Sequence, residues 1–276
     1  MDPDSKRAVT LDLWQTLIAQ PDGTAYSPTR NTIRLQNTLE ALAGLGEFVP
    51  ETALEAAFSQ ITQMIAADHL IGVDMHFDDR VTQVLLLVDP ELPERIGPGG
   101  IATVAEAVDR AFDTSPPHLL PGVPETLEAL QQMGLQLGLI SNTGFTSGDA
   151  YRRFFDNVGL TLFFKVLSFS NDMATAKPSP DIFHPTLEAL GVEPASALHV
   201  GDNLLTDVSG AAAIGMRTAW ITGYDLNEPM VTPDITLRDI THLPHEAERW
   251  RRASSRRTEQ PWTDEMTTPP TLGQPA

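Results

Sequence analysis

Short apolar runs alternate with longer amphipathic segments over much of the chain. The runs have the length and β-rich composition of buried strands, and they are Ala8–Leu13, Leu135–Ile140, Phe163–Ser168, Ala197–Val200 and Met216–Thr222. The segments with apolar residues at helical spacing are Pro124–Met133, Ser147–Val158, Asp181–Leu190 and Asp207–Ile214. This alternation predicts an α/β fold, a doubly wound parallel sheet with helices on both faces.

A long stretch after the first strand interrupts this alternation. Its helix-like segments are Ile33–Leu45, Glu51–Asp68, Arg80–Val88 and Ile101–Phe112, and turn-rich sequences such as Pro98-Gly99-Gly100 separate them. We therefore expect an all-helical cap domain over residues 19–117. The sheet domain would comprise residues 1–18 and 118–245, with linkers near residues 20–28 and 115–121.

Beyond residue 245 the apolar pattern decays into a segment rich in arginine, proline and threonine. Residues 246–276 are therefore expected to form a frayed tail. The alternative is a docking arm for an acidic partner, since blocks of like charge can serve as interaction tails. The sequence does not say which role the arginines have.

The charge balance of the chain limits the classes of molecule that it is expected to bind. The 276 residues include 18 basic and 37 acidic side chains, for a net charge of −19. A field of this sign disfavours nucleic acid and anionic membranes, so a small-molecule partner is expected. No apolar run approaches the ~20 residues of a membrane helix, and the polar N-terminus is unlike a secretory signal. These features favour a cytoplasmic location, whereas the oligomeric state stays open.

Polar residues follow the predicted strands directly. Asp12 lies at the end of the first run, Ser141 after the second and Gly201-Asp202 after the fourth. Because the C-terminal ends of parallel strands meet at one edge of a sheet, the side chains of Asp12 and Asp202 are expected to converge there. Two converging carboxylates repel unless a proton or cation lies between them. Mg²⁺ fits this position, since it prefers hard oxygen ligands.

Together with Lys177-Pro178 and Asp207, these segments resemble the motifs of haloacid dehalogenase-like hydrolases, in the order of that family. The resemblance implies an aspartyl nucleophile that forms a covalent intermediate. The catalytic residues that it implies are Asp12, Thr16, Ser141 and Lys177, with Asn142 beside them as a substrate-binding residue. It also implies Mg²⁺ bound by Asp12, by Asp202 and by the backbone carbonyl of Trp14, with Asp207 completing or orienting the shell.

Trp14 departs from the family pattern. Phosphatases of the family usually carry a second Asp at this position, which protonates the leaving oxygen and then activates water. Help of this kind contributes roughly 100- to 10,000-fold, and an indole supplies neither step. Gln15 replaces the glycine that usually follows.

Three functions are compatible with this departure. The first is a Mg²⁺-dependent phosphatase of a small phosphorylated metabolite, with a good leaving group or an acid–base group from the cap, for which the candidates are His69, Asp74, His76, Asp78 and Asp79. The second is a 2-haloacid dehalogenase, in which Arg30 and Arg34 clamp a carboxylate, unless they only occupy an exposed helix face. The third is a weakly catalytic binding or scaffold protein. Metal-free dehalogenases of the family typically lack an acid at Asp202, so the phosphatase ranks first.

Overall fold

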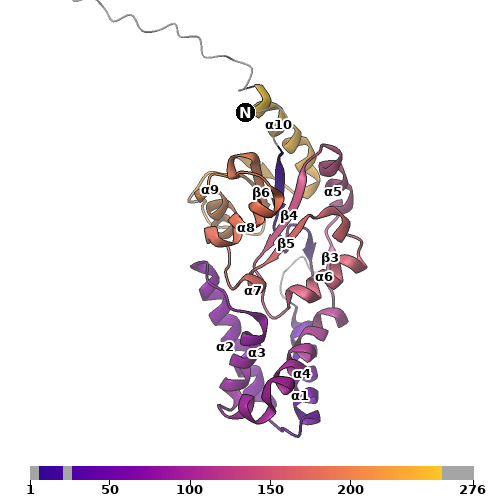
Figure 1. Ribbon diagram of the computed structural model, residues 1–276, viewed down its shortest axis with the longest axis vertical. Helices are drawn as coiled ribbons and strands as arrows, with labels where there is room; N and C mark the ends of the chain where they lie inside the picture. Colours follow the sequence, from indigo (N-terminus) through magenta and orange to yellow (C-terminus); the bar gives the residue numbers. More distant parts are fainter. Residues whose placement is uncertain (1–5, 21–26, 257–276) are drawn as a thin grey trace, which may run out of the picture.

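A six-stranded parallel sheet forms the centre of the molecule (Figure 1). The structure, a computed structural model, describes residues 6–20 and 27–256. The strand order is β5-β4-β1-β6-β7-β8. The strands are β1 (Ala8–Leu11), β4 (Gln136–Ser141), β5 (Val166–Phe169), β6 (Ala197–Gly201), β7 (Arg217–Ile221) and β8 (Ile235–Leu237). All five predicted strands are present, and the short β8 is an addition that the sequence did not predict.

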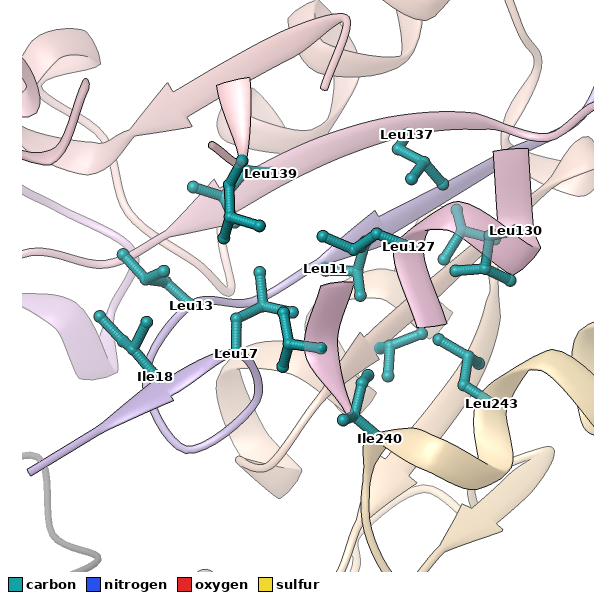
Figure 2. Packing of buried hydrophobic residues seen from close by; sticks show 14 of the residues in the cluster. Leu11, Leu13, Leu17, Ile18, Leu127, Leu130, Leu137, Leu139, Ile240 and Leu243 are labelled. Carbon is teal, nitrogen blue, oxygen red and sulfur yellow. The ribbon is translucent and has the colours of Figure 1, made fainter. Parts of the chain in front are cut away.

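Helices cover both faces of this sheet, which confirms the doubly wound α/β fold. They are α5 (Val123–Gln132), α6 (Gly148–Asn157), α7 (Ser170–Met173), α8 (Pro180–Leu190), α9 (Gly210–Ala213) and α10 (Leu243–Arg256). Successive side chains of β4 point to opposite faces of the sheet, and apolar residues lie on both faces, so both faces need a layer of helices. Leu137 and Leu139 join the apolar cluster under α5, α6 and α10, part of which Figure 2 shows, whereas Ile140 joins the cluster under α8 and α9.

Helix α10 corrects the prediction of a frayed tail from residue 246. The helix continues to Arg256, and its residues Leu243 and Ala247 are fully buried in the main cluster, with Trp250 packed against them. Their spacing of four and three residues places them on one helix face. Residues 257–276 lie outside the described residues. No helix in the described ranges is long and apolar enough to span a bilayer.

Four helices lie between the first strand and the rest of the sheet. They are α1 (Pro28–Gly44), α2 (Glu51–Leu70), α3 (Phe77–Val88) and α4 (Leu92–Thr114), and they enclose an apolar cluster of their own below the sheet in Figure 1. The predicted break at Pro98-Gly99-Gly100 falls at a kink inside α4, where Gly97 has a φ of 65°. The domain limits at residues 18/19 and 117/118 stay predictions.

The two chain segments that lead into and out of the four helices pair with each other. Strands β2 (Ile18–Ala19) and β3 (His118–Leu119) form a small antiparallel sheet. Helix α1 then begins at Pro28, whose ring fixes a helical φ, after the Ser27 side chain accepts a hydrogen bond from the Arg30 N–H at 3.1 Å. The helices are therefore held to the sheet by two paired strands rather than by one loose connection.

A buried arginine fixes the four helices against the loop that follows β4. The Arg80 guanidinium, on α3, donates to the backbone carbonyls of Thr143 and Gly144 and to the carboxylate of Asp74, which in turn contacts His69. The Arg80 side chain is fully buried and that of Asp74 is 1% exposed. Because breaking a buried ion pair leaves an uncompensated charge, this contact is expected to be essential for stability.

Replacing Arg80 by methionine is expected to lower the free energy of unfolding by about 3–5 kcal/mol, because Asp74 would remain buried without its cation. Urea denaturation at pH 7 measures the change. The matched control is Arg95→Met, which removes an arginine whose ion pairs with Glu47 and Asp89 lie at the surface, and its effect should be much smaller. Equal effects of the two substitutions would contradict this account.

Candidate active site

The carboxylate of Asp12 stands where β1 ends beside β6. The Asp12 N–H donates to the Val200 carbonyl at 2.8 Å, so the residue continues the pairing of β1 with β6 by one step. The next residues of β6 and its loop are Gly201 and Asp202, which explains why the two predicted acids meet. Asp12 is 7% exposed. The prediction that strand ends would gather these residues at one edge is confirmed by this geometry.

Lys177 is the cation of the site. Its Nζ donates to Asp12 Oδ1 at 2.5 Å, to Asp207 Oδ1 at 2.6 Å and to the Ile140 carbonyl at 2.8 Å. The side chain is 1% exposed. Burial alone would lower the pKa of Lys177, but the two carboxylates outweigh it and raise the pKa. The lysine is therefore charged and ties Asp12 to Asp207.

A π-helical turn, η3 (Leu204–Ser209), carries Asp207 into this cluster. Its N–H groups at Asp207 and Val208 both donate to the Asn203 carbonyl, at 3.0 and 3.2 Å. A Cβ at Gly201 would lie 2.2 Å from the Asp207 Cγ, so a glycine is required at that position. Turns of this wide type are frequent at functional sites.

The oxygens of Asp207 are already occupied by protein donors. Oδ1 accepts from Lys177 and lies 3.1 Å from Nε2 of His199, and Oδ2 accepts from the Asn203 N–H at 2.9 Å. Burial would raise the pKa of Asp207, but attraction by Lys177 and His199 lowers it below the usual range. Of the two roles expected for Asp207, these contacts favour orienting the site over binding a metal directly.

Asp202 completes a group of three carboxylates. Oxygens of Asp12, Asp202 and Asp207 lie within 4.8 Å of one another. Burial and repulsion from Asp12 raise the pKa of Asp202 to about 8, and burial raises that of Asp12 to about 6, even though Lys177 opposes the shift. At a pH where all three carboxylates are ionised, the charge of one lysine leaves them with an excess of negative charge. A divalent cation with oxygen ligands fits this excess, and Asp12 and Asp202 are the residues that would hold it.

Ser141 ends β4, on the other side of Asp12, and Asn142 follows it. The Asn142 amide donates to the Lys177 carbonyl at 2.9 Å and accepts from the Lys177 N–H at 2.8 Å. Both ends of the amide hold the lysine loop, which favours a positioning role over the expected contact with substrate. Ser141 is fully buried, and its hydroxyl contacts the Asn142 carbonyl at 3.2 Å.

Thr16 lies in the tight loop between β1 and β2. The N–H groups of Leu17 and Ile18 close this loop on the Leu13 carbonyl, at 2.8 and 3.0 Å. The Thr16 hydroxyl is fully buried and has no hydrogen-bond partner within the described ranges. A buried polar atom without a partner costs free energy, so an oxygen of a bound ligand would stabilise this position.

The indole of Trp14 is bound to neighbouring side chains. Its Nε1–H donates to the Tyr151 hydroxyl at 2.9 Å, and the Arg30 guanidinium lies 5.6 Å from the ring centre. Gln15, at the place of the usual glycine, adopts a φ of 59°, a left-handed conformation that is uncommon outside glycine.

Arg30 and Arg34 are buried, at 5% and 9% exposure, so the alternative of an exposed helix face is wrong. Arg30 donates twice to the Ser115 carbonyl, at 2.6 and 2.9 Å, and Arg34 donates to the Phe145 carbonyl at 3.0 Å. These bonds tie α1 to the returning linker and to the loop after β4. A clamp on a substrate carboxylate stays a prediction.

Sequence reasoning missed the side chains that hold the motif residues. Thr10, Tyr151 and His199 are buried polar residues within strands or helices, and each contacts a motif residue or lies one contact away from it. A threonine or histidine in a buried strand is by itself only a weak indication that the residue supports an active site. Their partners become visible only when the strands are side by side.

A family model and curated relatives were compared with this chain, and their descriptions agree with one another. A family model described as haloacid dehalogenase-like hydrolase matches residues 6–215. A glyceraldehyde 3-phosphate phosphatase of Methanopyrus kandleri is 31% identical over 235 residues, which cover 83% of this chain and 90% of that protein. A phosphoserine phosphatase of Thermus thermophilus is 30% identical over 198 residues, covering 71% and 75% of the two chains.

Other matches are shorter or structural. The haloacid dehalogenase-like hydrolase domain-containing protein 3 of Bos taurus is 31% identical over 148 residues, and the match spans 52% of this chain and 57% of that protein, little more than half of its length. A 2-haloacid dehalogenase of Pseudomonas syringae has a TM-score of 0.62 at 23% identity, over 89% of this chain and 99% of its own. A phosphatase of Thermococcus onnurineus has a TM-score of 0.58 at 24% identity, over 87% and 97%. These two structures share the fold.

Proposed function

The chain belongs to the haloacid dehalogenase-like hydrolase family, and on that premise we propose that it is a cytoplasmic, Mg²⁺-dependent phosphatase of a small phosphorylated metabolite. The observation that carries the proposal is the placement of Asp202 within 4.8 Å of Asp12 at the sheet edge. Two relatives that match most of this chain are named phosphatases, which supports the same chemistry.

Asp12 would act as the nucleophile. One of its carboxylate oxygens bonds to the phosphorus of the ester while the bond from phosphorus to the leaving oxygen breaks, which gives an aspartyl phosphate and an alkoxide or aryl oxide that takes its proton from solvent. Water then attacks phosphorus, releases phosphate and restores the carboxylate. Lys177, bonded to Asp12 Oδ1, keeps the nucleophile ionised and in place, and its charge stabilises the transferring group. The Thr16 hydroxyl, which has no partner among the described residues, would donate to a phosphoryl oxygen.

A bound Mg²⁺ would neutralise charge on the phosphoryl group and lessen the repulsion between the carboxylates. Asp12, Asp202 and the Trp14 carbonyl are the groups that we propose hold it, with Asp207 orienting Lys177. The four helices, proposed as a cap domain over residues 19–117, would exclude water from the site and select the substrate.

Because position 14 carries an indole, we expect the turnover rate to depend strongly on the leaving group of the phosphate ester. Without an acid at this position, aryl phosphates, whose leaving oxygen departs as a stable anion, should turn over about 100-fold or more faster than alkyl phosphates. Initial rates for a series of phosphate esters with Mg²⁺, plotted against the pKa of the leaving alcohol, measure this. A flat plot would show that another group, such as one on the cap, donates the proton.

A carbon–halogen hydrolase remains the second candidate, because halide leaves without a proton and the Trp14 indole would then be no handicap. The same carboxylate would attack the halogen-bearing carbon and form an ester. Halide release from a 2-haloacid in the presence of a chelator tests this candidate. Release at a rate above that for phosphate esters would reverse the order of the two functions.

The affinity for Mg²⁺ is expected to rise as the pH increases through about 6 to 8. The cation binds ionised carboxylates, whereas burial and mutual repulsion raise the pKa of Asp12 to about 6 and that of Asp202 to about 8 in the metal-free site. Protons therefore compete at lower pH, at a cost of up to about tenfold in affinity per pH unit for each proton released. Titration calorimetry in buffers of different ionisation enthalpy measures both the affinity and the protons. An affinity independent of pH would contradict the assigned ligands.

A further inference from the structure

A buried histidine lies behind the acids of the site. His199 is in the middle of β6, is 1% exposed and is in contact with three different elements. Its Nδ1 lies 2.8 Å from the Thr10 hydroxyl of β1, its Nε2 lies 3.1 Å from Asp207 Oδ1, and its ring packs edge-on against Phe183 of α8 at 5.3 Å. A ring held at its edge and at both nitrogens has little freedom to turn.

The partners of the ring define where its proton lies. Asp207 is ionised and can only accept, so Nε2 carries the hydrogen and donates it to Oδ1. Burial lowers the pKa of His199, which keeps the imidazole neutral and leaves Nδ1 bare. The Thr10 hydroxyl then donates to Nδ1. Each donor therefore has an acceptor along the path from Thr10 through His199 to Asp207.

This path ends on the nucleophile. Asp207 Oδ1, which accepts from His199, also accepts from Lys177 at 2.6 Å, and the same Nζ donates to Asp12 at 2.5 Å. Thr10 precedes Asp12 by two residues, so both side chains emerge on the same face of the sheet. Without the His199 donor, only Lys177 would hold Oδ1, and the carboxylate could rotate about its backbone N–H contact at Oδ2.

We propose that His199, fixed by Thr10, is a positioning residue that sets the orientation of the Asp207 carboxylate and thereby the place of Lys177 against Asp12. For its kinetic consequence the inference rests on the proposed function, because kcat is measured on phosphate esters. Its geometric consequence, a fixed Asp207, does not depend on which reaction the protein catalyses.

The kinetic test compares three substitutions along the path. His199→Phe keeps a flat ring of similar size but removes both hydrogen bonds, and it should lower kcat roughly 10- to 100-fold with KM little changed. His199→Gln, whose side-chain amide can still donate to Asp207, should recover most of that loss. Thr10→Val, which removes the hydroxyl from a residue of the same shape, should lower kcat in the same direction as His199→Phe, by a smaller factor.

Thr218→Val is the matched control for Thr10→Val. Thr218 is a buried threonine paired with His199 in register on β7, but its hydroxyl contacts Asp234 rather than the path. Its substitution should leave kcat unchanged. Equal kcat for His199→Phe, Thr10→Val and the unmodified protein would overturn the proposal, as would equal losses in His199→Phe and His199→Gln. If His199→Phe fails to fold, the kcat of Thr10→Val is compared with that of Thr218→Val, and equal values would overturn the proposal.

Two measurements separate this inference from the proposed function. ¹⁵N spectra of the histidine rings at pH 7.5 should show His199 with Nε2 protonated and Nδ1 bare, and the opposite tautomer would overturn the proposal. Crystal structures of the unmodified and Thr10→Val proteins should differ in the position of the Asp207 Oδ1 and the Lys177 Nζ. If these two atoms have the same positions in both proteins, the positioning proposal is overturned, even if phosphate esters are hydrolysed. If the atoms have moved, the proposal is supported, even if phosphate esters are not hydrolysed.

Discussion

Turnover of a phosphate ester is expected to fall by about 10⁴-fold or more when Asp12 is replaced by asparagine. The amide keeps the shape of the side chain and an oxygen that accepts from Lys177, but it lacks the charge and the free electron pair of the attacking carboxylate. Initial rates on an aryl phosphate with saturating Mg²⁺ measure the loss. Asp149→Asn is the control, since that side chain is 82% exposed on α6. A residual rate within tenfold of the unmodified protein would remove Asp12 as the nucleophile.

The same substitution should leave the stability at pH 8 equal or higher. Burial raises the pKa of Asp12 to about 6, so the folded state holds this proton more tightly than the unfolded state does. As the pH rises from about 4 through 6, ionisation in the folded state therefore costs stability, and a neutral asparagine avoids that cost. Urea denaturation of both proteins at pH 5 and pH 8 measures it. A loss at pH 8 would show that attraction to Lys177 exceeds the cost of burial.

Together the two results would identify Asp12 as a residue kept for reaction rather than for folding. Active sites commonly hold groups that destabilise the folded chain, because reactive charge has to be buried to be useful. The raised pKa of Asp202 belongs to the same pattern. A divalent cation would relieve both residues at once, so binding of Mg²⁺ should also raise the midpoint of thermal unfolding.

The motif residues were predictable because a parallel sheet places its strand ends together. Asp12 and Asp202 each follow a strand and Ser141 ends one, and strand order alone brings them to one edge. Periodicity was sufficient for the fold, since five strands were recognisable from their apolar runs, although they have only four to six residues each. It failed for β8, which has three residues in a segment rich in proline and charge. Local pattern carries little information over so short a length.

Other features depended on partners far away in the chain. The helix α10 has many charged residues, which suggested a frayed end, but Leu243, Ala247 and Trp250 form the narrow apolar face that anchors it. Arg30 was ambiguous for the opposite reason. A charged residue early in an amphipathic helix is normally exposed, and the Ser115 carbonyl together with the Phe112 ring makes its burial tolerable.

The roles of side chains inside the site were the least predictable. Asn142 is of a residue type that is common in turns, which explains its position without any distant contact. Its actual partner, the backbone of Lys177, lies 35 residues away in the sequence. His199 likewise has no local feature that distinguishes it from another strand residue. Such contacts depend on register between non-adjacent segments, for which one sequence contains no direct record.

Replacing Lys177 by methionine is expected to have the second large effect, on both activity and stability. Methionine has a similar length, but it leaves the carboxylates of Asp12 and Asp207 buried together without their shared cation. Breaking such an arrangement costs about 3–5 kcal/mol of unfolding free energy. The loss of the charge beside the transferring group should lower kcat by roughly 10²- to 10³-fold.

The stability deficit of Lys177→Met should grow with pH, and this dependence identifies its cause. Lys177 at present lowers the pKa of both carboxylates. Without it their pKa values rise, so the folded state binds more protons than the unfolded state and loses stability as the pH increases through those values. Urea denaturation should show a larger deficit at pH 8 than at pH 5, and Lys177→Met combined with Asp207→Asn should recover part of it. Lys165→Met, at an exposed lysine, is the control. A deficit that is equal at both pH values would mean that lost packing, rather than the stranded carboxylates, accounts for it.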